Sequence, residues 1–116
     1  MRYTLLLHSN EADFADLGPD DWAQIKSAYG AYIQSLNEAG VFVDTDWLVP
    51  SHAATTLTLK GGKKLIQDGP FADTKEQLGG YFVINVPDLD TALQWAEKCP
   101  AAHTSTIEIR PSAMEA

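Results

Sequence analysis

The chain has 116 residues, a length that fits one domain and leaves little room for a second. Hydrophobic residues make up 45% and charged residues 21% of it, as in a typical globular protein, which excludes disorder of the whole chain. Sixteen acidic and eight basic side chains give a formal net charge of −8, so neither nucleic acid nor an anionic membrane surface is expected as a partner.

The first part of the chain predicts a strand, a loop and a long helix. In residues 2–8, Leu5, Leu6 and Leu7 form an apolar run without the alternation of a half-exposed strand. Residues 9–18 show no clear period and predict a loop that could lie over a pocket. Pro19 then starts a helix with apolar residues at three- and four-residue spacing. Gly40 stands where a left-handed C-terminal cap ends such a helix.

A second strand follows the helix. Residues 41–49 alternate in polarity, with Asp44 and Asp46 on the same face, and Pro50 stops the strand. The two aspartates are a candidate carboxylate pair for proton transfer, although such a pair more often marks the solvent side of a sheet.

The next segment predicts a β-hairpin. Residues 55–60 alternate between apolar and polar side chains, and residues 63–67 supply the returning strand. Gly61 and Gly62 lie between them and can adopt the positive φ angles of a tight hairpin turn.

Residues 68–77 predict a loop, and residues 79–86 predict a strand that is apolar on both faces, like the first one. Gly79 and Gly80 are interpreted as turn glycines.

The C-terminal part predicts a helix and a last strand. Asp88 caps the helix and Pro100 ends it, and residues 104–110 form the strand. Cys99 lies in the last turn of the helix, where the negative end of the helix dipole raises the pKa of a thiol and disfavours a nucleophilic role. As the only cysteine of the chain, it also excludes an intramolecular disulfide and a multi-cysteine metal site.

The predicted order of elements is β-α-β, a β-hairpin, and β-α-β. This order indicates a single α+β domain, residues 1–116, of the ferredoxin-like split β-α-β type, with the hairpin as an elaboration. Two helices can cover only one face of such a sheet, and the two apolar strands leave no polar side for water. We therefore expect a second copy to cover that face, giving a homodimer built as a dimeric α/β barrel.

The string from Asp68 to Tyr81, DGPFADTKEQLGGY, resembles the DGPF subgroup of the YCII-related proteins, and Pro87-Asp88-Leu89-Asp90 and Glu108-Ile109-Arg110-Pro111 also match. The resemblance implies a dimeric α/β barrel, similar to the muconolactone isomerase type, with a cleft. It also implies small-molecule isomerases or lyases with a His-Asp pair among the wider relatives. Counting back from Gly40 places Tyr29 where their first helix carries the histidine.

The loop within that string gathers chemistry-bearing side chains. Asp68 and Lys75 are candidate catalytic residues, because a lysine can hold an anionic group and a carboxylate beside it can act as acid or base. Asp73 and Glu76 are candidate substrate-binding residues, but their spacing also fits a capping box for a short helical turn ending at Gly79.

Two aromatic residues of the same string, Phe71 and Tyr81, complete the predicted substrate-binding set. The alternative for Phe71 is a place in the core, and Asp68-Gly69-Pro70 is by itself a common turn sequence.

Three histidines occur, and none has a second ligand at the spacing of a local metal site, so no metal is expected. His8 ends the first strand and is a candidate catalytic residue together with Tyr29, the alternative being a solvated strand end. His52 and His103 lie in predicted turns. Glu108 and Arg110 point the same way along the last strand and are interpreted as forming cross-strand or intersubunit ion pairs.

Two functional hypotheses follow. The first is a cofactor-free acid/base enzyme of isomerase or lyase type that acts on a small polar or anionic organic molecule. The second is a non-catalytic module that binds a small metabolite or a partner protein, because members of the subgroup occur beside sigma-factor genes. No nucleotide-binding motif, transmembrane run or signal-type leader is found, so a cytoplasmic location is expected.

Overall fold

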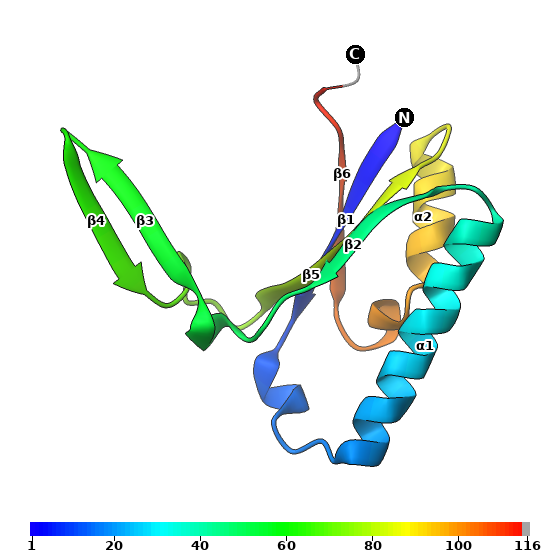
Figure 1. Cartoon of the computed structure of the whole chain (residues 1–116). Helices are drawn as coiled ribbons and strands as arrows, with labels where there is room; N and C mark the ends of the chain where they lie inside the picture. Colours follow the sequence, from blue (N-terminus) through cyan, green and yellow to red (C-terminus); the bar gives the residue numbers. More distant parts are fainter. Residues whose placement is uncertain (115–116) are drawn as a thin grey trace.

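The computed structural model describes residues 1–114 and has an α+β architecture. A four-stranded antiparallel sheet has the strand order β2-β5-β1-β6, with two helices on one side of it (Figure 1). The sheet strands are β1 (Arg2–Ser9), β2 (Phe42–Trp47), β5 (Gln77–Asn85) and β6 (Thr106–Pro111), and the helices are α1 (Pro19–Glu38) and α2 (Leu89–Lys98). This arrangement is consistent with the predicted ferredoxin-like fold.

The predicted helix ends are confirmed. Pro19 is the first residue of α1, and Asp21 Oδ2 accepts a hydrogen bond of 3.0 Å from the backbone N–H of Gly18. Gly40, just beyond the end of α1, has a φ of 71°, the left-handed conformation that glycine adopts without a steric penalty. At α2, Asp88 Oδ1 accepts a hydrogen bond of 2.8 Å from the N–H of Thr91, which satisfies one of the unpaired N–H groups at a helix start.

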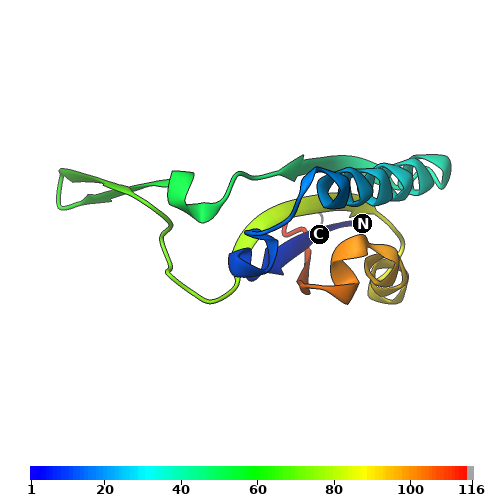
Figure 2. The same cartoon turned by 90° about the horizontal axis from the view of Figure 1, so that it is seen from below.

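The core lies between the helices and one face of the sheet. In β1, Tyr3, Leu5 and Leu7 are buried on this face, whereas Thr4, Leu6 and His8 lie on the other and are half-buried. The expectation that β1 has no alternation is therefore wrong, because a strand points successive side chains to opposite faces and the second face here carries polar groups as well as Leu6. We call this second face, which neither helix covers, the open face (Figure 2).

Gly79 and Gly80 lie inside β5 and not in a turn, which corrects the interpretation of these residues. The pairing of β1 with β5 shifts register between Leu7 and His8, from Leu7–Gly80 to His8–Leu78. A Cβ atom on Gly80 would lie 2.9 Å from the carbonyl oxygen of Asp46 in β2. The two glycines therefore lie at an irregularity of the strand pairing and at a close approach of two backbones. Both are common positions for glycine inside a strand.

The predicted hairpin is confirmed and stands apart from the sheet. Its strands, β3 (Thr55–Lys60) and β4 (Lys63–Asp68), pair only with each other among the strands of residues 1–114. The pair projects away from the helices and the sheet in both views (Figures 1 and 2). Gly61 and Gly62 have φ angles of 56° and 78° at the turn, as a two-residue hairpin loop requires. We call residues 55–68 the hairpin arm.

Candidate functional site

A histidine–carboxylate pair lies on the open face between β1 and β6. His8 Nε2 is 3.0 Å from Glu108 Oε1. The two side chains are diagonal neighbours, because His8 pairs with Thr106 and Leu6 pairs with Glu108 across the two strands. Arg110 Nε donates a hydrogen bond of 2.8 Å to the second oxygen, Glu108 Oε2.

The hydrogen bonds from Arg110 and then from His8 lower the pKa of Glu108 below its ordinary value, so the carboxylate is ionised near neutral pH. An ionised carboxylate only accepts hydrogen bonds, so Nε2 of His8 carries the proton in this contact. When the imidazole is neutral, Nδ1 is then left with a free electron pair. This arrangement orients a histidine as a proton acceptor.

His8 also forms part of the wall of a cleft of about 810 Å³. The lining residues come from the end of β1, the segment that follows it, the segment before β5, and the start of β6: His8, Asn10, Asp13, Thr74, Lys75, Glu76 and Thr106. The expectation that the loop after the first strand lies over a pocket agrees with this position of Asn10 and Asp13.

Hydrogen bonds hold the segment before β5 against the sheet. Thr106 Oγ1 donates to the two carboxylate oxygens of Glu76 at 3.2 and 3.3 Å. Gln77 Nε2 donates to the carbonyl oxygens of Ala72 at 2.8 Å and Thr74 at 3.2 Å. These contacts fix the backbone on both sides of Lys75, whose exposed side chain forms no ion pair within residues 1–114. The cleft therefore contains a free cation close to an oriented histidine.

A second contact anchors the segment after β1, which contributes Asn10 and Asp13 to the cleft. Glu11, the first residue of the short turn η1 (Glu11–Phe14), accepts hydrogen bonds from the hydroxyl group of Ser51 and from its backbone N–H, the latter at 2.9 Å. These bonds lower the pKa of Glu11. They connect the segment after β1 to η2 (Ser51–Ala53), at the base of the hairpin arm.

Of the predicted site residues, His8, Lys75 and Glu76 line the same cleft, and the others do not line it. Tyr29 packs under the sheet with its ring stacked on Phe82 at a centroid distance of 6.2 Å. Burial raises the pKa of Tyr29 to about 12, so this tyrosine is not a base near neutral pH.

The remaining four predicted residues lie elsewhere. Asp68 ends β4 and pairs with Thr55 at the base of the hairpin arm. Tyr81 lies on the open face and donates a hydrogen bond of 3.1 Å to Asp44 Oδ2. The alternatives given for the other two are wrong: Phe71 is 90% exposed and is not in the core, and no helical turn follows Asp73, because β5 already begins at Gln77.

Glu108 was assigned an ion pair but no part in a site. Its partner across the strands is His8 of β1, which sequence reasoning did not identify. Its contact with Arg110 lies within β6 and is therefore not the predicted cross-strand or intersubunit pair. The available signal was the alternation of Thr106, Glu108 and Arg110, which in a ferredoxin-like sheet order puts Glu108 on the same face as His8.

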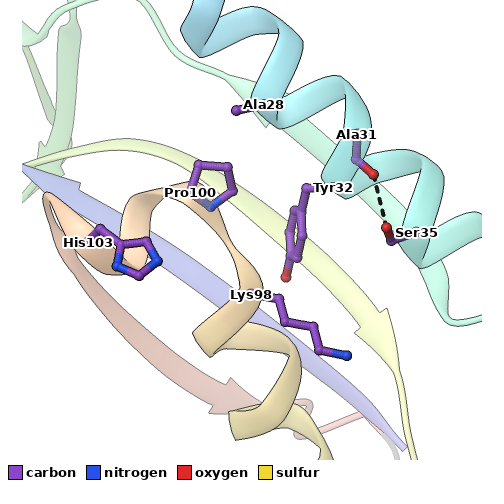
Figure 3. Close-up of a pocket in the computed structure, with 7 residues that line it drawn as sticks. All are labelled: Ala28, Ala31, Tyr32, Ser35, Lys98, Pro100 and His103. Carbon is purple, nitrogen blue, oxygen red and sulfur yellow. Dashed lines mark hydrogen bonds between the residues drawn. The ribbon is translucent and has the colours of Figure 1, made fainter.

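Another hollow, of about 480 Å³, lies between α1 and the α2–η3 segment, η3 being Pro100–His103. Figure 3 shows Tyr32 pointing into it between the two helices. Two hydroxyl groups there form hydrogen bonds within the chain: Tyr32 Oη donates to the carbonyl oxygen of Trp95 at 2.8 Å, and Ser35 donates to that of Ala31 at 3.1 Å. Lys98 Nζ lies 4.8 Å from the centroid of the Trp95 ring. Of these contacts, the hydrogen bond from Tyr32 to Trp95 joins the two helices, whereas the other two lie within one helix each.

Within residues 1–114, no helix is long and apolar enough to cross a membrane. The same residues contain no group of three or more histidine, cysteine, aspartate or glutamate side chains placed to hold a metal ion.

Residues 1–113 of this chain match the family model described as the YCII-related domain. The protein therefore belongs to the YCII-related family. A protein of Rhizobium meliloti (strain 1021), itself described as uncharacterized, is 34% identical over 116 residues, which cover 98% of this chain and 94% of that protein.

Proposed function

We propose that this protein is a cofactor-free acid/base enzyme of isomerase or lyase type that acts on a small organic anion. The observation that carries the proposal is the 3.0 Å contact between His8 and Glu108 at the wall of a cleft that also contains Lys75. In this proposal His8 is the general base, Lys75 binds the anionic group, and Glu108 is a positioning residue.

The reaction begins with a substrate carboxylate bound to the ammonium group of Lys75, which places the neighbouring C–H bond near His8. Nδ1 of His8 takes the proton, and the electron pair of the C–H bond moves into the adjacent carbonyl or double bond. In an isomerase the imidazolium returns the proton to another carbon, whereas in a lyase the electron pair expels a leaving group. Glu108 stays ionised and stabilises the imidazolium.

A homodimer is part of the proposal, because Leu6, Tyr81 and Val83 lie only half-buried on the open face. A second sheet packed on this face would exclude water from them and complete a dimeric α/β barrel. The string from Asp68 to Tyr81 supports membership in the DGPF subgroup, and we place the activity in the cytoplasm.

The test measures proton exchange directly. Acetoacetate and 2-oxoglutarate are incubated with the protein in D₂O, and deuterium uptake next to the carbonyl group is followed by NMR. We expect exchange above the uncatalysed rate, a loss of about 100-fold or more of that catalysed rate in His8→Gln, and a raised half-saturating concentration in Lys75→Met.

Lys26→Met, which removes an exposed lysine of α1 outside the cleft, is the matched control and is expected to behave as the wild type. Glu108→Gln is expected to slow exchange but to add little when His8→Gln is already present, because both residues act through one imidazole. If His8→Gln exchanges deuterium as fast as the wild type does, His8 is not the base.

The second candidate is a non-catalytic module that binds a small metabolite or a partner protein, with a role in sigma-factor regulation. The exposure of Lys75 and Glu76 favours it, because reversible binding of an anion does not require a water-excluded site. This candidate would be supported over the enzyme if acetoacetate and 2-oxoglutarate stabilise the fold of the wild type but not that of Lys75→Met, and if no deuterium exchange is observed.

A further inference from the structure

We propose that the hairpin arm docks on a second copy of this chain, with its apolar face packed against that copy and its lysine-rich tip on the acidic segment of residues 13–20. The hairpin arm lies outside the cleft, and among residues 13–20 Asp13 is the residue that lines it. This inference does not depend on the proposed chemistry.

One face of the arm carries three exposed apolar side chains, with Lys64 opposite Leu59 near the tip. The pairing of Leu57 with Ile66 places these two side chains on the same face, and Leu59 follows two residues along the same strand. Leu57, Leu59 and Ile66 are 58%, 67% and 57% exposed. A two-stranded hairpin alone is marginally stable in water and needs a further packing surface. The arm therefore carries the pattern of a strand pair that is half-buried in an assembly.

The dimensions of the chain show that its own body does not supply this packing surface. The radius of gyration is 16.1 Å, whereas a compact domain of this length has a value of about 13 Å. The difference arises because the arm extends away from the sheet and helices in both views (Figures 1 and 2).

The charge at the tip indicates which surface the arm fits. Lys60, Lys63 and Lys64 surround the turn, so three of the eight basic residues of the chain lie there. All three are exposed, and within the described residues 1–114 none forms an ion pair. Because the whole chain has a net charge of −8, the tip is attracted to other parts of the same protein.

The acidic segment provides the complementary charges. Asp13, Asp16 and Asp20 are exposed, and no hydrogen bond or ion pair engages their carboxylates within residues 1–114. The turn of the arm lies far from this segment of its own chain in both views (Figures 1 and 2). A second copy is needed to bring the two together. Two-fold symmetry would then make the contact twice in one dimer.

A charge exchange between copies tests the proposal by sedimentation velocity at about 50 mM salt, where surface ion pairs are weakly screened. One variant carries Lys63→Glu and Lys64→Glu, and the other carries Asp16→Lys and Asp20→Lys. Each variant alone is expected to dimerise at least about tenfold more weakly than the wild type, since like charges meet at both contacts. An equimolar mixture is expected to form heterodimers with nearly the wild-type dissociation constant.

A matched pair of variants tests the apolar face. Leu57→Asp with Ile66→Asp is expected to weaken the dimer, whereas Thr58→Asp with Gln67→Asp adds the same charge to the opposite face and is expected to weaken it much less. Circular dichroism on each variant verifies that the sheet and helices are folded.

Any of three results would overturn the proposal. The wild type could be monomeric at 100 µM protein, a concentration at which a weak dimer would already form. The arm variants could dimerise as the wild type does, or the mixture of the two charge variants could fail to restore dimerisation. None of these results bears on deuterium exchange at His8. Conversely, an absence of exchange leaves the docking of the arm unaffected.

Discussion

The thiol of Cys99 illustrates how one buried side chain makes the stability of the fold depend on pH. Its side chain is 0% exposed, and burial raises the pKa of the thiol to about 11 from an ordinary value of 9.0. The folded state therefore holds this proton more tightly than the unfolded state does. The contribution of the neutral thiol to the free energy of unfolding is complete below pH 9 and is lost as the pH rises from 9 to 11.

We predict that the wild type loses roughly 2 kcal/mol more of its free energy of unfolding than Cys99→Ala does over this pH range. Urea unfolding at closely spaced pH values measures the difference. Tyr29 and Tyr32 are present in both chains, and burial and then the negative charge of the Cys99 thiolate raise their pKa values. The comparison therefore measures the thiol together with its coupling to these two tyrosines. Equal slopes in the two chains would show that the thiol is not protected by burial.

The sequence identified some of the site residues and missed another. His8 and Lys75 were selected because imidazole and ammonium groups have recognisable chemistry, and both line the cleft. Glu108 was missed as a site residue because its partner lies 100 residues away. A pairing of this kind depends on the register of two strands, and no local pattern specifies that register.

The paired glycines of β5 provide a prediction for one structural element. We predict that Gly80→Ala destabilises the protein by about 1–3 kcal/mol, because the added methyl group would lie 2.9 Å from the backbone oxygen of Asp46 and would force β2 and β5 apart. Gly79→Ala is the matched control, since its methyl group meets only the oxygen of Leu7 at 3.9 Å. Thermal unfolding of the two variants side by side measures the contrast, and equal melting temperatures would contradict it.

The elements that the sequence predicted correctly have ends set by local chemistry. Asp88 caps α2 through its own side chain, and Gly61 and Gly62 form the hairpin turn through their own backbone angles. The helical turn predicted from Asp73 and Glu76 does not form. Thr106 of β6 engages the Glu76 carboxylate instead, so a tertiary contact overrides a local pattern.

For the whole molecule, the proposed dimer predicts a melting temperature that depends on protein concentration. Unfolding of a dimer to two chains becomes about 1.4 kcal/mol less favourable for each tenfold rise in concentration. With the usual unfolding entropy per residue, this amounts to about 3 °C per tenfold for a dimer of this size. Differential scanning calorimetry across a hundredfold range measures it. A melting temperature that stays constant over that range would indicate a monomer.

The sequence predicted the α+β architecture but not the character of the open face. The run Leu5-Leu6-Leu7 suggested a strand with two apolar faces, whereas only Leu6 of the three belongs to the face that carries His8. The projection of the hairpin arm away from the sheet could not be predicted either, because alternation along a hairpin determines its two faces but not its direction relative to the sheet.

The position of β1 has a consequence for how the protein is made. β1 leaves the ribosome before the other strands of residues 1–114, yet its neighbours in the sheet are β5 and β6, which follow all the other strands in the chain. Leu5 and Leu7 must therefore remain unpaired through most of translation, and the sheet closes late through contacts between distant parts of the chain. Slow synthesis or a stalled ribosome would prolong the exposure of this apolar segment, and nascent chains of this protein should depend on chaperones that hold such segments.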